Sequence, residues 1–170
     1  MIMAQDEGRF GRISRAIKCW APAHVRPVVG AQIVREYVYA YSAVCPASGQ
    51  ITSLILPYAN SEMMTLFLNQ VASDFSDYFI IMQVDGAAWH KSGSLNIPEN
   101  IRLIQQPAYS PELNPVEHIW DDIREKEFAN RLFDSIDAVM DCLCSGLNRL
   151  ALEPCYLKSL TGFSHIINAL

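Results

Sequence analysis

The chain has 170 residues, of which 51% are hydrophobic, and a formal net charge of −5. This length predicts a single domain, residues 1–170, with a well-buried core, and the apolar content excludes a disordered chain. An acidic balance also argues against a protein that coats DNA by charge alone.

Targeting and cysteine patterns indicate an intracellular protein. No apolar run approaches the ~20 residues of a membrane span, and the first residues lack the basic and apolar regions of a signal peptide. The five cysteines are odd in number and lack Cys-x-x-Cys spacing, so they predict reduced thiols rather than disulfides or zinc ligands. We therefore expect a soluble, cytoplasmic protein without membrane contact.

The charges are unevenly distributed along the chain. Residues 1–35 contain six basic and two acidic residues, a balance of +4, so the remainder is strongly acidic. A basic first segment beside an acidic body is suited to holding phosphates, although solvated strand and loop charges give the same pattern.

The first third of the chain is rich in strand formers. Ile2–Gln5 is expected to end a first strand, with Arg12–Lys18 pairing back on it. The runs Tyr37–Val44 and Ile51–Leu56 predict a hairpin, because the link between them carries proline and glycine. Three largely antiparallel strands should therefore come first.

Helices and strands then alternate. Ser61 is a candidate cap for a helix, and the apolar run Tyr78–Val84 predicts a strand covered on both faces. A short strand is expected at Ile101–Ile104, followed by a helix that begins at Asn114 with proline at its first position. A last long helix is expected between residues 133 and 150. This order predicts an α/β fold with a central mixed sheet flanked by helices.

Three acidic residues stand at predicted ends of elements, where a fold can bring them together. They are Asp6 after the first strand, Asp85 after the buried strand and Glu117 in the first turn of the later helix. Converging carboxylates repel one another unless a cation holds them, and oxygen ligands suit Mg²⁺ or Mn²⁺. Two such ions support phosphodiester chemistry.

Each acid also has a structural alternative. Asp6 can be a solvated strand end, and Asp85 with Gly86 can form a hairpin turn. Glu117 stands three residues after Asn114, the spacing of a capping box. Asp121, one turn further along the same helix face, is an alternative third ligand.

Three segments carry a family resemblance. They are Asp-Glu-x-Arg-Phe-Gly at residues 6–11, Asp-Gly-Ala-x-Trp-His at residues 85–90, and Tyr-Ser-Pro-Glu-Leu-Asn-Pro-Val-Glu-His at residues 109–118. From Gln5 to about Gly162 the chain resembles the catalytic domain of bacterial insertion-sequence transposases of the mariner-related Asp-Asp-Glu superfamily. The resemblance implies an RNase H-like fold, two Mg²⁺ (or Mn²⁺) ions held by Asp6, Asp85 and Glu117, and cutting and joining of transposon-end DNA.

The resemblance also implies partners. Transposon-end and target DNA are expected ligands, and a homodimer is expected in the DNA complex. The candidate DNA-contacting residues are Arg9, Arg12, His90, Lys91 and His118. Members of this family normally carry helix-turn-helix modules before the catalytic domain, and five residues precede Asp6 here. We therefore expect an isolated domain, a frame joined to an upstream helix-turn-helix polypeptide by frameshifting, or a decayed copy.

Two other functions agree with the same sequence. A catalytically silent regulator would keep the fold and act by dimerising with a complete transposase. A general RNase H-like nuclease would cut without regard to transposon ends. Local departures from the family pattern occur before Glu117, at Gln105, Gln106 and Ala108, none of which is a proposed ligand.

Overall fold

A five-stranded mixed sheet forms the centre of the protein. The computed structural model describes residues 1–170 except 15, 87–94 and 168–170. The strand order is β3-β2-β1-β4-β5. β2 runs antiparallel to both β1 and β3, whereas β4 runs parallel to β1 and β5 runs parallel to β4. The strands are β1 (Ile2–Ile13), β2 (Ile33–Cys45), β3 (Gln50–Leu56), β4 (Ile80–Val84) and β5 (Ile101–Gln105).

The first strand is longer than the sequence pattern suggested. β1 continues past Asp6 to Ile13, and its pairing with β2 runs from Ala4 opposite Val44 to Ile13 opposite Ile33. The predicted strand end at Asp6 is therefore wrong, as is the predicted return of residues 12–18 onto this strand. The residues after Asp6 are mostly polar or glycine and do not show the apolar pattern of a strand. They are nevertheless in a strand, because their backbone groups pair with the distant strand β2.

The predicted hairpin is confirmed. β2 and β3 pair antiparallel from Tyr39 opposite Leu56 to Cys45 opposite Gln50. Gly49 lies in the turn between them with a φ of +74°, and an added Cβ would lie 2.1 Å from the carbonyl oxygen of Pro154. Only glycine combines this backbone conformation with so close an approach.

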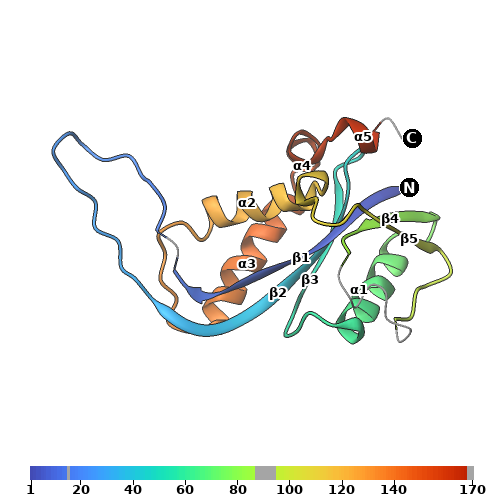
Figure 1. Ribbon diagram of the computed structural model, residues 1–170, viewed down its shortest axis with the longest axis horizontal. Helices are drawn as coiled ribbons and strands as arrows, with labels where there is room; N and C mark the ends of the chain where they lie inside the picture. The colour runs from blue at the N-terminus through green and yellow to red at the C-terminus, as the bar shows by residue number, and fades with distance from the viewer. Residues whose placement is uncertain (15, 87–94, 168–170) are drawn as a thin grey trace.

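Helices cover both faces of the sheet (Figure 1). α1 (Ser61–Asp74) packs on one face, while the other face carries α2 (Val116–Lys126), α3 (Ile136–Ala151) and α4 (Pro154–Thr161). A short α5 (Ser164–Ile167) follows. The sheet therefore separates two apolar cores, one beneath α1 and one beneath α2 and α3.

Two helix starts differ from prediction by one or two residues. Asn60, rather than Ser61, caps α1, because its side chain accepts the backbone N–H of Met63 at 2.9 Å. α2 begins at Val116, after a short 3₁₀ turn at Pro111–Leu113. Polar residues adjacent in sequence compete for the same cap, and the fold decides between them.

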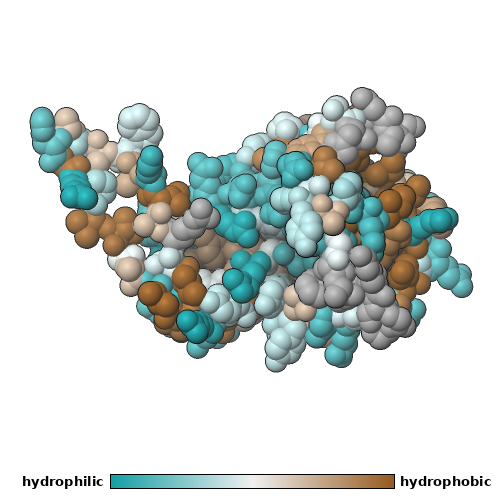
Figure 2. Space-filling view, viewed as in Figure 1, coloured by the Kyte–Doolittle hydropathy of each residue, from teal (hydrophilic) through white to brown (hydrophobic). Residues whose placement is uncertain are grey.

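Residues 16–32 form a long arm that projects from the body of the molecule (Figures 1 and 2). At its base the backbone N–H of Ser14 donates to the carbonyl of Gln32 at 3.0 Å, and the N–H of Gln32 donates to Ser14 Oγ at 2.8 Å. Trp20 in this arm is fully exposed. No helix in the described part of the chain is long and apolar enough to cross a membrane.

Candidate active site

Asp6 lies in the middle of β1, on the face of the sheet that α2 covers. Alternation along the strand puts the neighbouring Glu7 on the opposite face. The indole Nε1 of Trp120 donates a hydrogen bond to Asp6 Oδ2 at 2.7 Å. Burial raises the pKa of Asp6 to about 7, the indole hydrogen bond opposes this rise, and the nearby carboxylates of Glu117, Glu7 and Asp85 add to it.

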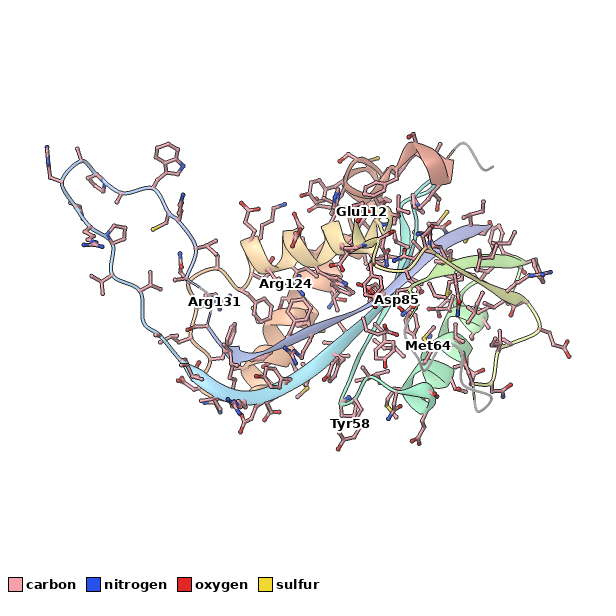
Figure 3. The ribbon with its side chains drawn as sticks, in the orientation of Figure 1. Tyr58, Met64, Asp85, Glu112, Arg124 and Arg131 are labelled. Carbon is pink, nitrogen blue, oxygen red and sulfur yellow. The ribbon has the colours of Figure 1, made fainter. Side chains whose placement is uncertain are left out.

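Asp85 follows the last residue of β4, the strand beside β1. Because β4 pairs in parallel with both β1 and β5, Asp85 and Gly86 do not form a hairpin turn between adjacent antiparallel strands. Residues 80, 82 and 84 of β4 are buried in the core under α1, so alternation directs Asp85 to the opposite face, where Asp6 lies. In Figure 3, Asp85 lies between the sheet and the start of α2.

Glu117 is the second residue of α2 and does not form a capping box with Asn114. The backbone N–H of Asn114 donates to the carbonyl of Pro111 at 2.9 Å, not to the Glu117 carboxylate. The Asn114 side chain instead accepts the N–H of Val116, the first residue of α2, at 3.1 Å. Burial raises the pKa of Glu117, with Arg124 opposing the rise and Asp121 and Asp85 adding to it.

One cavity of about 390 Å³ is lined by all three acids. Its remaining wall comes from Gly86 and from the segment 106–114 before α2. Among the described residues, no three or more His, Cys, Asp or Glu side chains are grouped closely enough to hold a metal ion. The structure therefore gathers the acids in one cavity without closing them into a complete ligand set.

The donor chemistry nevertheless fits a hard divalent cation. All three side chains supply carboxylate oxygens, which Mg²⁺ and Mn²⁺ prefer. Their mutual repulsion contributes to the raised pKa values of Asp6 and Glu117, and a bound cation would relieve it.

Two side chains that sequence reasoning missed fix the segment before α2 to the sheet. Gln83 of β4 donates through Nε2 to the carbonyl of Leu113 at 3.0 Å, and Asn114 donates through Nδ2 to the carbonyl of Gln5 at 3.1 Å. The start of the Glu117 helix is thus tied to both aspartate-bearing strands. The Asn-Pro dipeptide at residues 114–115 was a signal of a helix start, but not of this long-range contact.

A larger cavity of about 810 Å³ lies at the base of the arm, beside α2, and Figure 2 shows the hollow between arm and body. Its lining includes Arg9 and Arg12, two of the predicted DNA-contacting residues, together with Arg124 and Arg131. Arg12 is partly engaged by an ion pair with Glu36 at 2.7 Å. Four arginines and two carboxylates, Asp121 and Glu125, therefore line this cavity, which leaves a positive balance.

Neither His118 nor Asp121 lines the cavity that holds the three acids. His118 points to α4: its Nδ1 lies 3.0 Å from the carbonyl of Leu160, and its ring packs edge-on against Phe163. Asp121, the alternative third ligand, lines the larger cavity rather than the acidic one. His90 and Lys91 lie outside the described residues.

The fold and the three gathered acids define the class of protein. Residues 1–140 match the family described as DDE superfamily endonuclease, and the chain belongs to this family. Its fold is that of an RNase H-like transposase catalytic domain, as predicted.

The comparisons also find individual relatives. The chain is 34% identical over 125 residues to the uncharacterized protein y4pE/y4sA of Sinorhizobium fredii, an alignment that covers 73% of this chain and 93% of the relative. Among solved structures it is similar to the Mos1 mariner paired-end complex with Mn (TM-score 0.63, 16% identity) and the Mos1 strand transfer complex (TM-score 0.61, 16% identity). Each alignment covers 95% of this chain, which spans about half the length of those chains, 56% and 55%.

Proposed function

We propose that this domain cuts and joins DNA at transposon ends by divalent-metal-dependent phosphoryl transfer, with Asp6, Asp85 and Glu117 as the metal ligands. The observation that carries the proposal is the single cavity lined by acids from β1, β4 and α2. Membership of the endonuclease family supports the reaction class.

The ligand set is incomplete without the substrate. Mg²⁺ sites of this kind keep water and take substrate phosphate oxygens as ligands, so three protein carboxylates need not enclose the ion by themselves. A pair of bound ions supplies activation of the attacking oxygen and stabilisation of the leaving one. The chain's own part is to hold the carboxylates in place and to shape the cavity around the scissile phosphate.

The cations around the larger cavity suit a path for the DNA backbone. Arg12 of β1 donates through Nε to the carbonyl of Phe133, on the side of the sheet where Asp6 lies, and Arg124 is on the same helix as Glu117. Phosphates bound along these guanidinium groups would lead toward the acidic cavity. Transposon-end and target DNA as ligands, a homodimer in the DNA complex and an upstream helix-turn-helix polypeptide remain part of the proposal.

The test is cleavage and joining of duplex DNA that carries the ends flanking the gene, in Mg²⁺ or Mn²⁺. Asp6→Asn, Asp85→Asn and Glu117→Gln should each reduce the rate by orders of magnitude. Asp141→Asn is the control, because Asp141 is an exposed carboxylate of α3 that lines neither cavity, and it should cleave normally. Equal cutting of unrelated duplexes would favour a general nuclease, and no cutting by the wild-type chain would favour a silent regulator.

A further inference from the structure

Trp120 is the largest side chain that is fully buried in the core beneath α2, with 1% of its surface exposed. Its ring packs across β1, where Gly8 leaves room for it: a Cβ added to Gly8 would lie 2.8 Å from the indole. Phe10 meets the same ring edge-on, with centroids 5.8 Å apart. Packing on both sides therefore fixes the orientation of the indole.

The polar edge of this ring is directed at a proposed metal ligand. Nε1 of Trp120 donates to Asp6 Oδ2 at 2.7 Å, within the range of hydrogen bonds to charged carboxylates. Trp120 is also on the same helix as Glu117, three residues further along, so one rigid element carries one ligand and orients another.

We propose that Trp120 is a positioning residue for the metal site, which holds the Asp6 carboxylate in the orientation needed to bind a divalent ion. This inference rests on the proposed function of Asp6. A carboxylate held by one fixed donor loses the freedom to rotate, and partners of this kind orient metal ligands and increase metal affinity.

A purely structural role predicts a different outcome. A buried indole N–H needs an acceptor, and Asp6 would then serve Trp120 rather than the reverse. In that case, removal of the N–H would change stability while leaving metal affinity as it was. The two roles are separated by measuring both quantities on variants that differ in the N–H.

Two replacements of Trp120 carry the experiment on the 170-residue chain. Trp120→Phe removes the N–H and part of the ring, and incorporation of β-(3-benzothienyl)alanine at this position replaces the N–H with sulfur while keeping the ring volume. Trp20→Phe is the matched control at a fully exposed tryptophan. Ile123→Val is the control for lost core volume one turn further along α2, away from Asp6.

The measurements are the thermal unfolding midpoint and the Mn²⁺ affinity in the presence of duplex DNA that carries the ends. The affinity comes from the electron paramagnetic resonance signal of free Mn²⁺, corrected for the ions that the DNA binds alone. Both Trp120 replacements should bind Mn²⁺ about 10- to 100-fold more weakly. Trp20→Phe and Ile123→Val should keep wild-type affinity, even where Ile123→Val lowers the midpoint. The benzothienyl protein should bind weakly although its core is filled.

Two results would overturn the inference. Wild-type Mn²⁺ affinity in both Trp120 replacements, in a chain whose wild type cleaves DNA, would overturn the positioning role alone. A wild-type chain that neither cleaves DNA nor binds Mn²⁺ more tightly than Asp6→Asn would overturn the proposed function, and the positioning role with it.

Discussion

Asn114 donates a hydrogen bond from Nδ2 to the backbone carbonyl of Gln5, 109 residues earlier in the chain, at 3.1 Å. The same side chain accepts the N–H of Val116 through Oδ1, also at 3.1 Å. Asn114 is 2% exposed, so neither bond is exchanged readily for water. One amide therefore connects the strand position before Asp6 with the helix turn that carries Glu117.

Replacement of Asn114 should uncouple these two elements. Asn114→Ala removes both hydrogen bonds at a buried position and should lower the free energy of unfolding by about 2 kcal/mol. Asn114→Asp keeps the acceptor for Val116 and loses the donor to Gln5. Both variants should cleave DNA more slowly than wild type. Chemical denaturation and the cleavage assay measure the two effects.

The control for Asn114 is Asn148→Ala, at an exposed position of α3, where a change within about 0.5 kcal/mol is expected. An Asn114→Ala protein with wild-type stability and cleavage would show that the proline turn alone positions α2.

Glu117→Gln should separate catalysis from folding. Gln keeps the size of the side chain but loses the anionic oxygen, so cleavage and joining should fall by orders of magnitude. The unfolding midpoint should not fall, because the N–H of Asn114 bonds to Pro111 rather than to the Glu117 carboxylate and because burial already disfavours the Glu117 charge. Circular dichroism melting and DNA cleavage test both statements. A destabilised variant that still cuts DNA would direct the search for the third ligand to Asp121.

Sequence patterns predicted the order of the elements because apolar periodicity and turn residues act locally. They placed Asp85 after a buried strand and Glu117 in the first turn of a helix, and both placements are found. The same patterns wrongly predicted that β1 ends at Asp6. The strand continues to Ile13 because it pairs with β2, which begins at Ile33 on the other side of the arm in sequence. The contacts of Trp120 with Asp6 and Asn114 with Gln5 join residues more than 100 positions apart, and their side-chain geometry exists only after the sheet and α2 have packed.

Asp6 should make the metal-free protein less stable as the pH rises. Its pKa in the folded state is about 7 against an ordinary value of 3.8, so the folded state holds a proton that the unfolded state has already lost between these values. The free energy of unfolding therefore decreases from about pH 4 to pH 7, by up to about 4 kcal/mol for this shift. Asp6→Asn should stabilise the metal-free chain more at pH 8 than at pH 5.

The metal should reverse this effect. Mn²⁺ added at pH 8 should raise the unfolding midpoint of the wild type, because a ligand that binds only the folded state stabilises it. Asp6→Asn should show little of this increase. Urea denaturation at pH 5 and pH 8, with and without Mn²⁺, gives all four values. Equal stabilisation by Asp6→Asn at both pH values would mean that Asp6 is ionised in the folded state across this range.

An ion cluster around the buried carboxylate of Asp122 holds the other end of α2 against α3 and α4. Asp122, whose side chain is 4% exposed, lies 2.6 Å from Lys126 Nζ and 2.6 Å from Arg149, and it accepts a hydrogen bond from the Tyr156 hydroxyl. Burial alone would raise the pKa of Asp122, but the hydrogen bonds from these three partners outweigh it and lower the pKa. This stabilisation is present above the carboxyl's ordinary pKa and is lost as the pH falls through the lowered value.

Asp122→Ala should be among the most destabilising single changes in the helical layer. It leaves the cations without their carboxylate partner, and removing one member of a fully buried pair costs about 3–5 kcal/mol. Because the side chains of Lys126 and Arg149 are 45% and 26% exposed and Arg149 keeps Glu127 at 3.1 Å, the loss should lie below that range, at about 2 kcal/mol. The exposed pair Asp121 and Arg124, 3.7 Å apart, is the matched control, and Asp121→Ala should cost less than about 1 kcal/mol. Urea denaturation at pH 7 compares the two variants, and similar small losses would show that the Asp122 cluster adds no net stability.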